Sequence, residues 1–131
     1  LSPEPGRAGQ RARAADRLGV AVTIRRLVGP DAHPAGLLAE ADLVISTLPA
    51  GAGDPLAEAG WRPEQAVLDV VYHPWPTALA GAAATAGARV ISGASMLLFQ
   101  AARQVELMTG SAAPVAAMRA ALLAAAPGCG G

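Results

Sequence analysis

Residues 43–48 read Leu-Val-Ile-Ser-Thr-Leu, and residues 66–72 read Ala-Val-Leu-Asp-Val-Val-Tyr. Both runs have the length and the β-branched, apolar composition of strands. The first is apolar at nearly every position, as expected for a strand of a parallel sheet whose two faces are both covered. Pro74 and Pro76 follow the second run and prevent a longer strand or helix there. The two runs therefore predict buried strands of one parallel sheet.

Segments with helical character alternate with these runs. We expect helices over residues 7–18, 34–40, 77–86 and about 95–109, a brief helix capped by Asp54, a final helix opened by Pro114, and further strands at 20–24 and 89–92. Strands and helices that alternate in steps of about 25 residues are typical of βα units and a parallel sheet. The predicted fold is therefore α/β, a partial Rossmann-like doubly wound parallel sheet followed by two C-terminal helices.

The glycine-rich loop of a complete dinucleotide-binding domain is not present in these residues. A Rossmann domain normally opens with a strand and G-x-G-x-x-G, which holds the pyrophosphate at a helix N-terminus. Gly51 and Gly53 follow the 43–48 strand, but two glycines without the third are more typical of a tight turn than of a phosphate site. We expect a partial dinucleotide-binding domain over 1–92, C-terminal helices over 93–126 and a flexible tail over 127–131.

The composition excludes several classes of function. Ten basic and ten acidic residues leave no net charge, which argues against a dedicated nucleic-acid binder. Every basic residue is Arg, so lysine catalysis is unavailable within the chain. One Cys and two His residues exclude an internal disulfide and suggest no metal site. Pro and Gly interrupt every long uncharged stretch and no signal peptide is visible, so we expect no membrane span and a cytoplasmic location.

Two blocks of sequence carry a family resemblance. Residues 69–79 read D-V-V-Y-H-P-W-P-T-A-L, and residues 93–101 read G-A-S-M-L-L-F-Q-A, with one helix and one strand predicted between them. In this order and spacing they resemble the C-terminal half of shikimate dehydrogenase, whose members carry D-x-x-Y-x-P-x-x-T-x-L and then G-x-x-M-L-x-x-Q-A. The resemblance covers about residues 42–123, and the preceding segment fits the helix and strand that follow the second strand of a Rossmann domain.

The resemblance implies an NADP-dependent oxidoreductase that interconverts 3-dehydroshikimate and shikimate on the route to chorismate and the aromatic amino acids. The binding residues that it implies are Tyr72 and Gln100 for the substrate and Ser46, Thr47, Val70, Gly93 and Met96 for the cofactor. Tyr72 would offer its hydroxyl to the substrate carboxylate, and Gln100 its amide to the substrate hydroxyls. Gly93 would present its carbonyl to the nicotinamide carboxamide, while Val70 and Met96 line the ring.

The position of these residues along the chain agrees with a general rule for open α/β sheets, which bind ligands beyond the carboxyl ends of their strands. Thr47, Tyr72 and Gly93 all fall at predicted strand ends, so we expect them to line one rim. A glycine also lets backbone approach a planar ligand without an intervening Cβ. Ser92 or Ser95 is expected to cap the helix that follows.

The resemblance also implies parts that this sequence lacks. In the family, an N-terminal domain supplies a Lys–Asp pair for proton transfer, and the two C-terminal helices pack on it. The sequence contains no lysine, no glycine-rich phosphate loop and no basic residue before Ser2 to select NADP. We therefore expect a fragment that has no catalytic residue and is inactive alone. Its uncovered apolar surface and open sheet edge should favour self-association.

Several alternatives stay open from the residues themselves. Asp69 is better suited to hydrogen bonds with loop amides than to general-base chemistry, and His73 to a solvated loop position. Arg7 could reach an adenosine phosphate, although a solvated Arg is more typical of an Ala-rich helix. At the level of function, the alternatives are a quinate/shikimate dehydrogenase that uses NAD, and a non-catalytic binding or assembly module that retains the fold.

Overall fold

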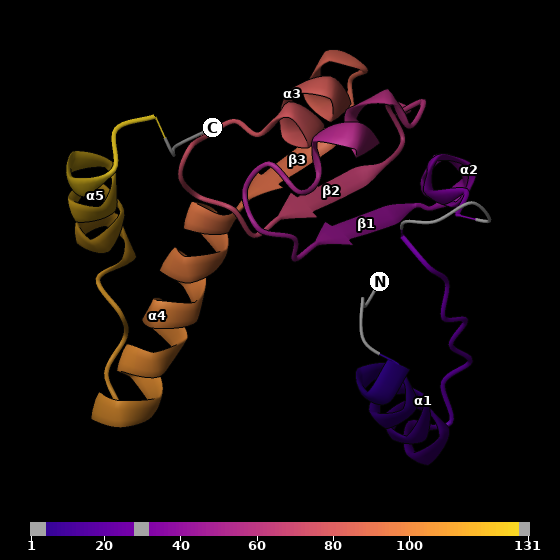
Figure 1. Cartoon of the computed structure of the whole chain (residues 1–131). Helices are drawn as coiled ribbons and strands as arrows, with labels where there is room; N and C mark the ends of the chain where they lie inside the picture. The colour runs from indigo at the N-terminus through magenta and orange to yellow at the C-terminus, as the bar shows by residue number, and fades with distance from the viewer. Residues whose placement is uncertain (1–4, 28–31, 129–131) are drawn as a thin grey trace.

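The computed structural model describes residues 5–27 and 32–128, which contain a three-stranded parallel sheet flanked by helices (Figure 1). The strands are β1 (Leu43–Ser46), β2 (Ala66–Asp69) and β3 (Arg89–Ser92), in the spatial order β1-β2-β3. They end in register, because Ser46 pairs with Asp69 and Asp69 pairs with Ser92. The predicted α/β class with a parallel sheet is confirmed.

Helices account for most of the other described residues. They are α1 (Pro5–Leu18), α2 (Pro34–Glu40), the 3₁₀ helix η1 (Asp54–Glu58), α3 (Ala78–Thr85), α4 (Gly93–Thr109) and α5 (Val115–Ala125). Figure 1 shows η1 and α3 over one face of the sheet, and α4 leaving the end of β3 with α5 beside it. Within the described ranges, no helix is both long enough and apolar enough to cross a membrane.

The ends of α3 and α4 follow the capping signals in the sequence. Thr77 caps α3, since its hydroxyl oxygen accepts a hydrogen bond from the N–H of Ala80 at 3.1 Å. Ser92 caps α4 in the same way, accepting from the N–H of Ser95 at 3.3 Å. This cap starts α4 two residues before the predicted position. Gly110 ends α4 in the left-handed conformation, with φ of 69°, as the sequence predicts.

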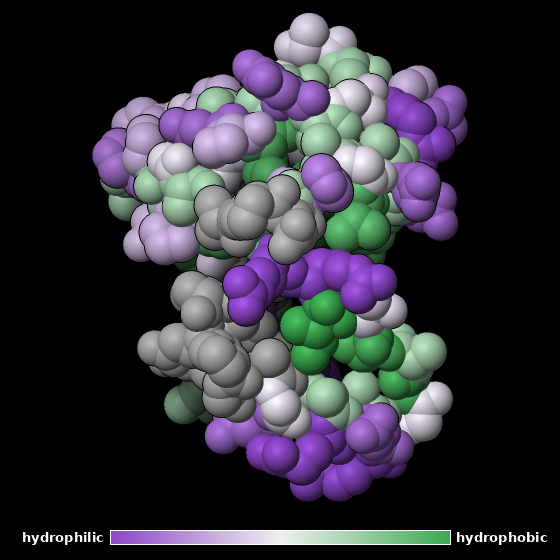
Figure 2. Space-filling model, turned by 45° about the vertical axis from the view of Figure 1, so that its right-hand side comes forward, coloured by the Kyte–Doolittle hydropathy of each residue, from purple (hydrophilic) through white to green (hydrophobic). Residues whose placement is uncertain are grey.

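The predicted strand at residues 20–24 is wrong. The segment is outside the sheet, and Val20, Val22 and Ile24 are 55%, 53% and 40% exposed. β-branched residues favour an extended chain, but a strand forms only where a neighbouring strand receives its backbone hydrogen bonds. In the Rossmann order 3-2-1-4-5-6 the third strand pairs only with the second, and the described residues contain no such neighbour. Figure 2 shows apolar surface just above the hydrophilic lower end of the molecule.

The predicted cap at Asp54 is also wrong, and two strands are shorter than predicted. Gly53 occupies the cap position of η1 because its carbonyl oxygen already accepts the first helical bond, from the N–H of Leu56 at 2.9 Å. Asp54 is therefore the first residue of the helix and makes no capping hydrogen bond. β1 and β2 stop at Ser46 and Asp69, where the connections to η1 and α3 begin.

The apolar core lies between the sheet and the two helices on its covered face. Its buried members are Val44, Leu56, Val67, Leu79, Ala83 and Ala88. β1 has its only recorded strand partner in β2, so among the described residues one edge of the sheet is open. The other face of β1 is open as well, with Leu43 55% and Ile45 57% exposed. The open edge expected from the sequence is thus present.

One buried polar side chain joins α2 to the sheet. Gln65 precedes β2 and is 1% exposed. Its Nε2 donates to the carbonyl oxygens of Leu38 and Ala41, both at 2.7 Å, and its Oε1 accepts from the N–H of Arg62 at 2.8 Å. The Gln65 amide therefore satisfies carbonyls at the end of α2 and fixes that end against the start of β2.

Replacing Gln65 with leucine should strongly destabilise the fold. Gln65→Leu leaves two carbonyls and one N–H without their partner, and an unsatisfied buried group costs about 1–3 kcal/mol. We expect the free energy of unfolding, measured in urea, to fall by about 2–4 kcal/mol. The exposed Gln104 supplies the matched control, since Gln104→Leu should change stability by less than about 0.5 kcal/mol. Equal stability of the two variants would contradict a structural role for Gln65.

Candidate functional site

The candidate site lies at the carboxyl edge of the sheet. Ser46, Asp69 and Ser92 end the three strands side by side in register. The chain then leaves by three routes: from β1 into the loop before η1, from β2 into residues 70–76, and from β3 directly into α4. Ligands of open α/β sheets bind outside this edge, so the three departing segments form the wall of any such site.

Gly93, the first residue of α4, packs against the backbone that follows β2. It is buried, and its N–H donates to the carbonyl oxygen of Val71 at 3.3 Å. A Cβ at this position would overlap the carbonyl oxygen of Val70 and lie 3.0 Å from that of Val71. Glycine is thus required here by contact between two protein segments, whereas the sequence had suggested space for a ligand.

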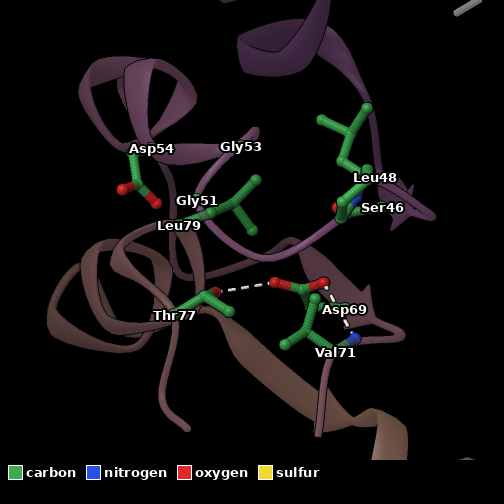
Figure 3. A pocket seen from close by; sticks show the side chains of 10 residues that line it. Ser46, Leu48, Gly51, Gly53, Asp54, Asp69, Val71, Thr77 and Leu79 are labelled. Carbon is green, nitrogen blue, oxygen red and sulfur yellow. Dashed lines mark hydrogen bonds between the residues drawn. The ribbon is translucent and has the colours of Figure 1, made fainter. Parts of the chain in front are cut away.

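The side chain of Asp69 binds the same backbone segment after β2. Its side chain is buried, with 2% of the residue exposed. One carboxylate oxygen accepts from the hydroxyl of Thr77 at 2.7 Å, and the other accepts from the N–H of Val71 at 3.3 Å (Figure 3). The hydrogen bond to a loop amide that the sequence predicts for Asp69 is confirmed. Both oxygens are engaged by the protein, which supports a structural role over that of a general base.

A shallow pocket lies beside this carboxylate, between the loop after β1 and the segment after β2. It is lined by Ser46, Leu48, Pro49, Gly51, Gly53, Asp54, Asp69, Val71, Thr77 and Leu79 (Figure 3). Gly51 has φ of 80°, and its carbonyl accepts from the N–H of Asp54 at 3.2 Å, as in a tight turn. The cavity volume of the pocket is about 10 Å³, room for about one water molecule. It is too small to enclose a dinucleotide.

The structure brings together three of the residues assigned to the cofactor. The N–H of Val70 donates to the carbonyl oxygen of Ser46 at 3.0 Å, and Gly93 lies against Val70. Thr47 follows Ser46 directly and is exposed. Backbone hydrogen bonds thus join these positions of β1, β2 and α4 into one continuous edge.

The remaining assigned residues are Tyr72, Met96 and Gln100. Tyr72 is 52% exposed. Met96 is half-buried and Gln100 is exposed, one turn farther along α4. Gln100 lies seven residues after Gly93, which is about 10 Å along the helix. The structure therefore places both Tyr72 and Gln100 on exposed surface.

Some sequence-based predictions fall outside the described residues. The side chain of Arg7 is not described, and neither are residues 129–131 of the predicted tail. His73 is exposed, as expected. In the described part of the chain, no three His, Cys, Asp or Glu residues are grouped as metal ligands.

Sequence analysis missed the function of Thr77. Its hydroxyl joins the Asp69 carboxylate to the start of α3, because it donates to Asp69 and accepts from the N–H of Ala80. Two signals were available: Thr77 precedes an Ala-rich helical run, and it belongs to the same motif as Asp69. Spacing could not show that the two side chains meet.

The in-register sheet, the glycine-packed strand end and the long helix that follows define a class: a Rossmann-like α/β unit with a helical extension. The extension carries the family signal, since residues 93–123 match the model of the shikimate 5'-dehydrogenase C-terminal domain. The chain is 46% identical over 91 residues to the shikimate dehydrogenase (NADP(+)) of Halobacterium salinarum, covering 66% of this chain and 34% of that protein. For the enzyme of Methanopyrus kandleri the identity is 37% over 123 residues, 83% of this chain and 42% of that protein.

Solved structures agree with the sequence relatives. The crystal structure of Mycobacterium tuberculosis shikimate dehydrogenase is similar with a TM-score of 0.78 and 38% identity, over 95% of this chain and 45% of that one. The crystal structure of a shikimate 5-dehydrogenase from Mycobacterium fortuitum is similar with a TM-score of 0.77 and 42% identity, over 90% of this chain and 43% of that one. The chain carries the C-terminal domain of shikimate dehydrogenases over residues 93–123 and is similar to the C-terminal part of these enzymes. It spans less than half the length of the relatives named here.

A pair of glycine substitutions tests the packing at Gly93. Gly93→Ala introduces a methyl group that overlaps the Val70 carbonyl, and we expect it to cost at least about 1–3 kcal/mol of stability, as overpacking does. Gly81→Ala is the matched control, because Gly81 lies within α3 and a Cβ there meets no atom within 4 Å. It should gain about 0.5–1 kcal/mol from helix propensity. Urea unfolding measures both, and a neutral Gly93→Ala would refute the close approach.

Proposed function

We propose that the chain forms the C-terminal part of an NADP-dependent shikimate dehydrogenase, which reversibly transfers hydride between NADPH and 3-dehydroshikimate. One observation carries the proposal: the segment that bears Tyr72 packs directly on Gly93 at the start of α4. The resemblance assigns these two residues to substrate and nicotinamide, and a hydride acceptor and donor must lie side by side. The names of the relatives, which specify NADP(+), support the choice of cofactor.

The described residues fit one side of a nicotinamide site. Val70 and Met96 are both half-buried and apolar, and they lie after β2 and in the first turn of α4, where they would line a flat ring. Gly93 would offer its carbonyl to the carboxamide, and Ser46 and Thr47 would lie beside the cofactor at the end of β1. The bound cofactor supplies the hydride. The chain supplies position and a wall against water.

Substrate recognition in this proposal depends on two exposed polar groups. The Tyr72 hydroxyl donates to the carboxylate of shikimate, and the Gln100 amide donates to and accepts from its hydroxyls. The substrate carboxylate carries a full charge, so the tyrosine bond belongs to the stronger, charge-assisted kind.

The domain assignment is part of the proposal: 1–92 as the partial dinucleotide-binding domain, 93–126 as the helices and 127–131 as a tail.

The proposal includes inactivity of the 131 residues by themselves. The family's Lys–Asp pair has no equivalent in a sequence without lysine. General acid–base assistance is worth about 10²–10⁴-fold in rate, and no positioned group in the site replaces it. The chain is then expected to bind ligands without reducing 3-dehydroshikimate.

A second candidate is supported by one structural neighbour. The quinate dehydrogenase of Corynebacterium glutamicum, solved with NAD, is similar with a TM-score of 0.65 and 26% identity over 88% of this chain. The same edge could therefore serve quinate and NAD. The two candidates differ in ligand preference, so titration with both pairs of ligands separates them.

Calorimetric titration of the chain tests the proposed function. We expect weak binding of shikimate and NADPH to the parent chain. Tyr72→Phe should weaken shikimate binding about tenfold, the effect of losing a hydrogen bond to a charged group, and leave NADPH binding unchanged. His73→Asn, on the neighbouring exposed position, is the control and should bind both ligands as the parent does. A folded chain that binds neither ligand would favour the non-catalytic module, and measurable dehydrogenase activity would refute the predicted inactivity.

Exposed side chains near the end of α4 lead to a proposal about self-association. Leu107 is 70%, Met108 85% and Leu97 39% exposed, whereas Leu98 is buried. Adjacent exposed apolar side chains favour association with another surface of the same kind.

Sedimentation should therefore show a concentration-dependent dimer at micromolar protein. Leu107→Glu is expected to shift the equilibrium toward monomer, because a charge placed on an apolar contact must be desolvated. Gln104→Glu places the same carboxylate on an exposed polar position of the same helix, and it should leave the equilibrium unchanged. A compact monomer at every concentration would rule out association through this surface.

A further inference from the structure

We infer that Asp69 is a positioning residue, which sets the register between the segment that carries Tyr72 and the start of α4 that carries Gly93. The inference rests on the proposed function for the meaning of that register. Asp69 itself is buried and both of its carboxylate oxygens are bound by the protein, so in this inference it acts through other residues.

The first part of the argument concerns the loop between Tyr72 and α3. The hydrogen bond from the Thr77 hydroxyl to Asp69, at 2.7 Å, joins the two ends of residues 70–76. Thr77 is held in turn by its capping bond from the N–H of Ala80. The base of the loop is therefore closed by a charge-assisted hydrogen bond, which is about twice as strong as one between neutral groups.

The second part concerns Val71, which is bound on both sides. Its N–H donates to Asp69 at 3.3 Å, and its carbonyl oxygen accepts from the N–H of Gly93, also at 3.3 Å. Asp69 is thus linked to Gly93 through the two peptide groups that flank Val71. Tyr72 is the next residue, so the orientation of its backbone follows from the same two bonds.

The third part concerns charge. No salt bridge to Asp69 occurs within the described ranges. The carboxylate has the Thr77 hydroxyl, the Val71 N–H and the nearby N-terminal end of α3 to offset its burial. Asp69 therefore holds its partners firmly, because each of them satisfies a buried charge. Removing the charge should therefore weaken the hydrogen bonds of the Val71 and Gly93 amides more than those in the core of β2.

Amide hydrogen exchange of the full 131-residue chain, followed by NMR, tests this order of effects. Asp69→Asn keeps the size of the side chain and removes its charge, and Thr77→Val removes the hydroxyl that closes the loop. We expect both to speed exchange at Val71 and Gly93 about tenfold more than at the core amide of Val67. Thr77→Ser keeps the hydroxyl and should restore the parent rates.

Gln65→Leu is the matched control, because Gln65 is a buried polar residue at the opposite end of the same strand. It should raise exchange at Val67 as much as at Val71 and Gly93. Equal acceleration at all three amides in the Asp69 and Thr77 variants would overturn the inference. Where Asp69→Asn does not fold, the pair Thr77→Val and Thr77→Ser makes the same comparison.

Binding separates this inference from the proposed function. If the parent chain binds shikimate and NADPH, Asp69→Asn should weaken both by about tenfold, whereas Gln65→Leu in its folded form should weaken neither. Unchanged affinities in Asp69→Asn would overturn the positioning role. If the parent chain binds neither ligand, the proposed function fails, and the exchange rates at Val71 and Gly93 still decide whether Asp69 sets the register.

Discussion

The close approach of two backbones, Gly93 against Val70 and Val71, is the constraint on which the candidate site depends. β3 ends at Ser92 and α4 begins at the next residue, so no loop is available to carry the helix away from its neighbour. The helix can start there only if its first residue has no Cβ. The direction of α4, and with it the positions of Met96 and Gln100, follows from this packing.

The strand in the centre of the sheet is fixed by polar side chains at both of its ends. Gln65 binds the end of α2 at the start of β2, and Asp69 binds the loop and α3 at its finish. Val67, between them, is fully buried. A four-residue strand offers little apolar area, so these buried hydrogen bonds give it a defined position that hydrophobic burial alone, being non-directional, would not. Of the two, only Asp69 binds the segment that borders the candidate site.

The sequence correctly predicted helices and strands that depend on short-range patterns and whose packing partners are among the described residues. The strand at 89–92 and the end of α4 at Gly110 depend on short-range patterns and are correct. The strand at 20–24 failed, since strand formation depends on a partner that composition does not reveal. Gly93 was identified for a reason other than the packing that the structure shows, because only coordinates reveal which backbone lies against it. Gln65 escaped notice for the same reason: the three groups that it binds belong to distant or unpatterned segments.

The candidate site has a rigid half and an open half, and this division limits what the chain can do. Ser46, Val70 and Gly93 are joined by backbone contacts, whereas Tyr72 and Gln100 are exposed residues. A hydrogen bond made at an exposed position competes with water, so it adds only about tenfold in affinity even to a charged partner. Hydride transfer also requires that water be kept from the reacting atoms. Under the proposed function, a substrate bound at Tyr72 and Gln100 would therefore remain partly hydrated on this exposed surface.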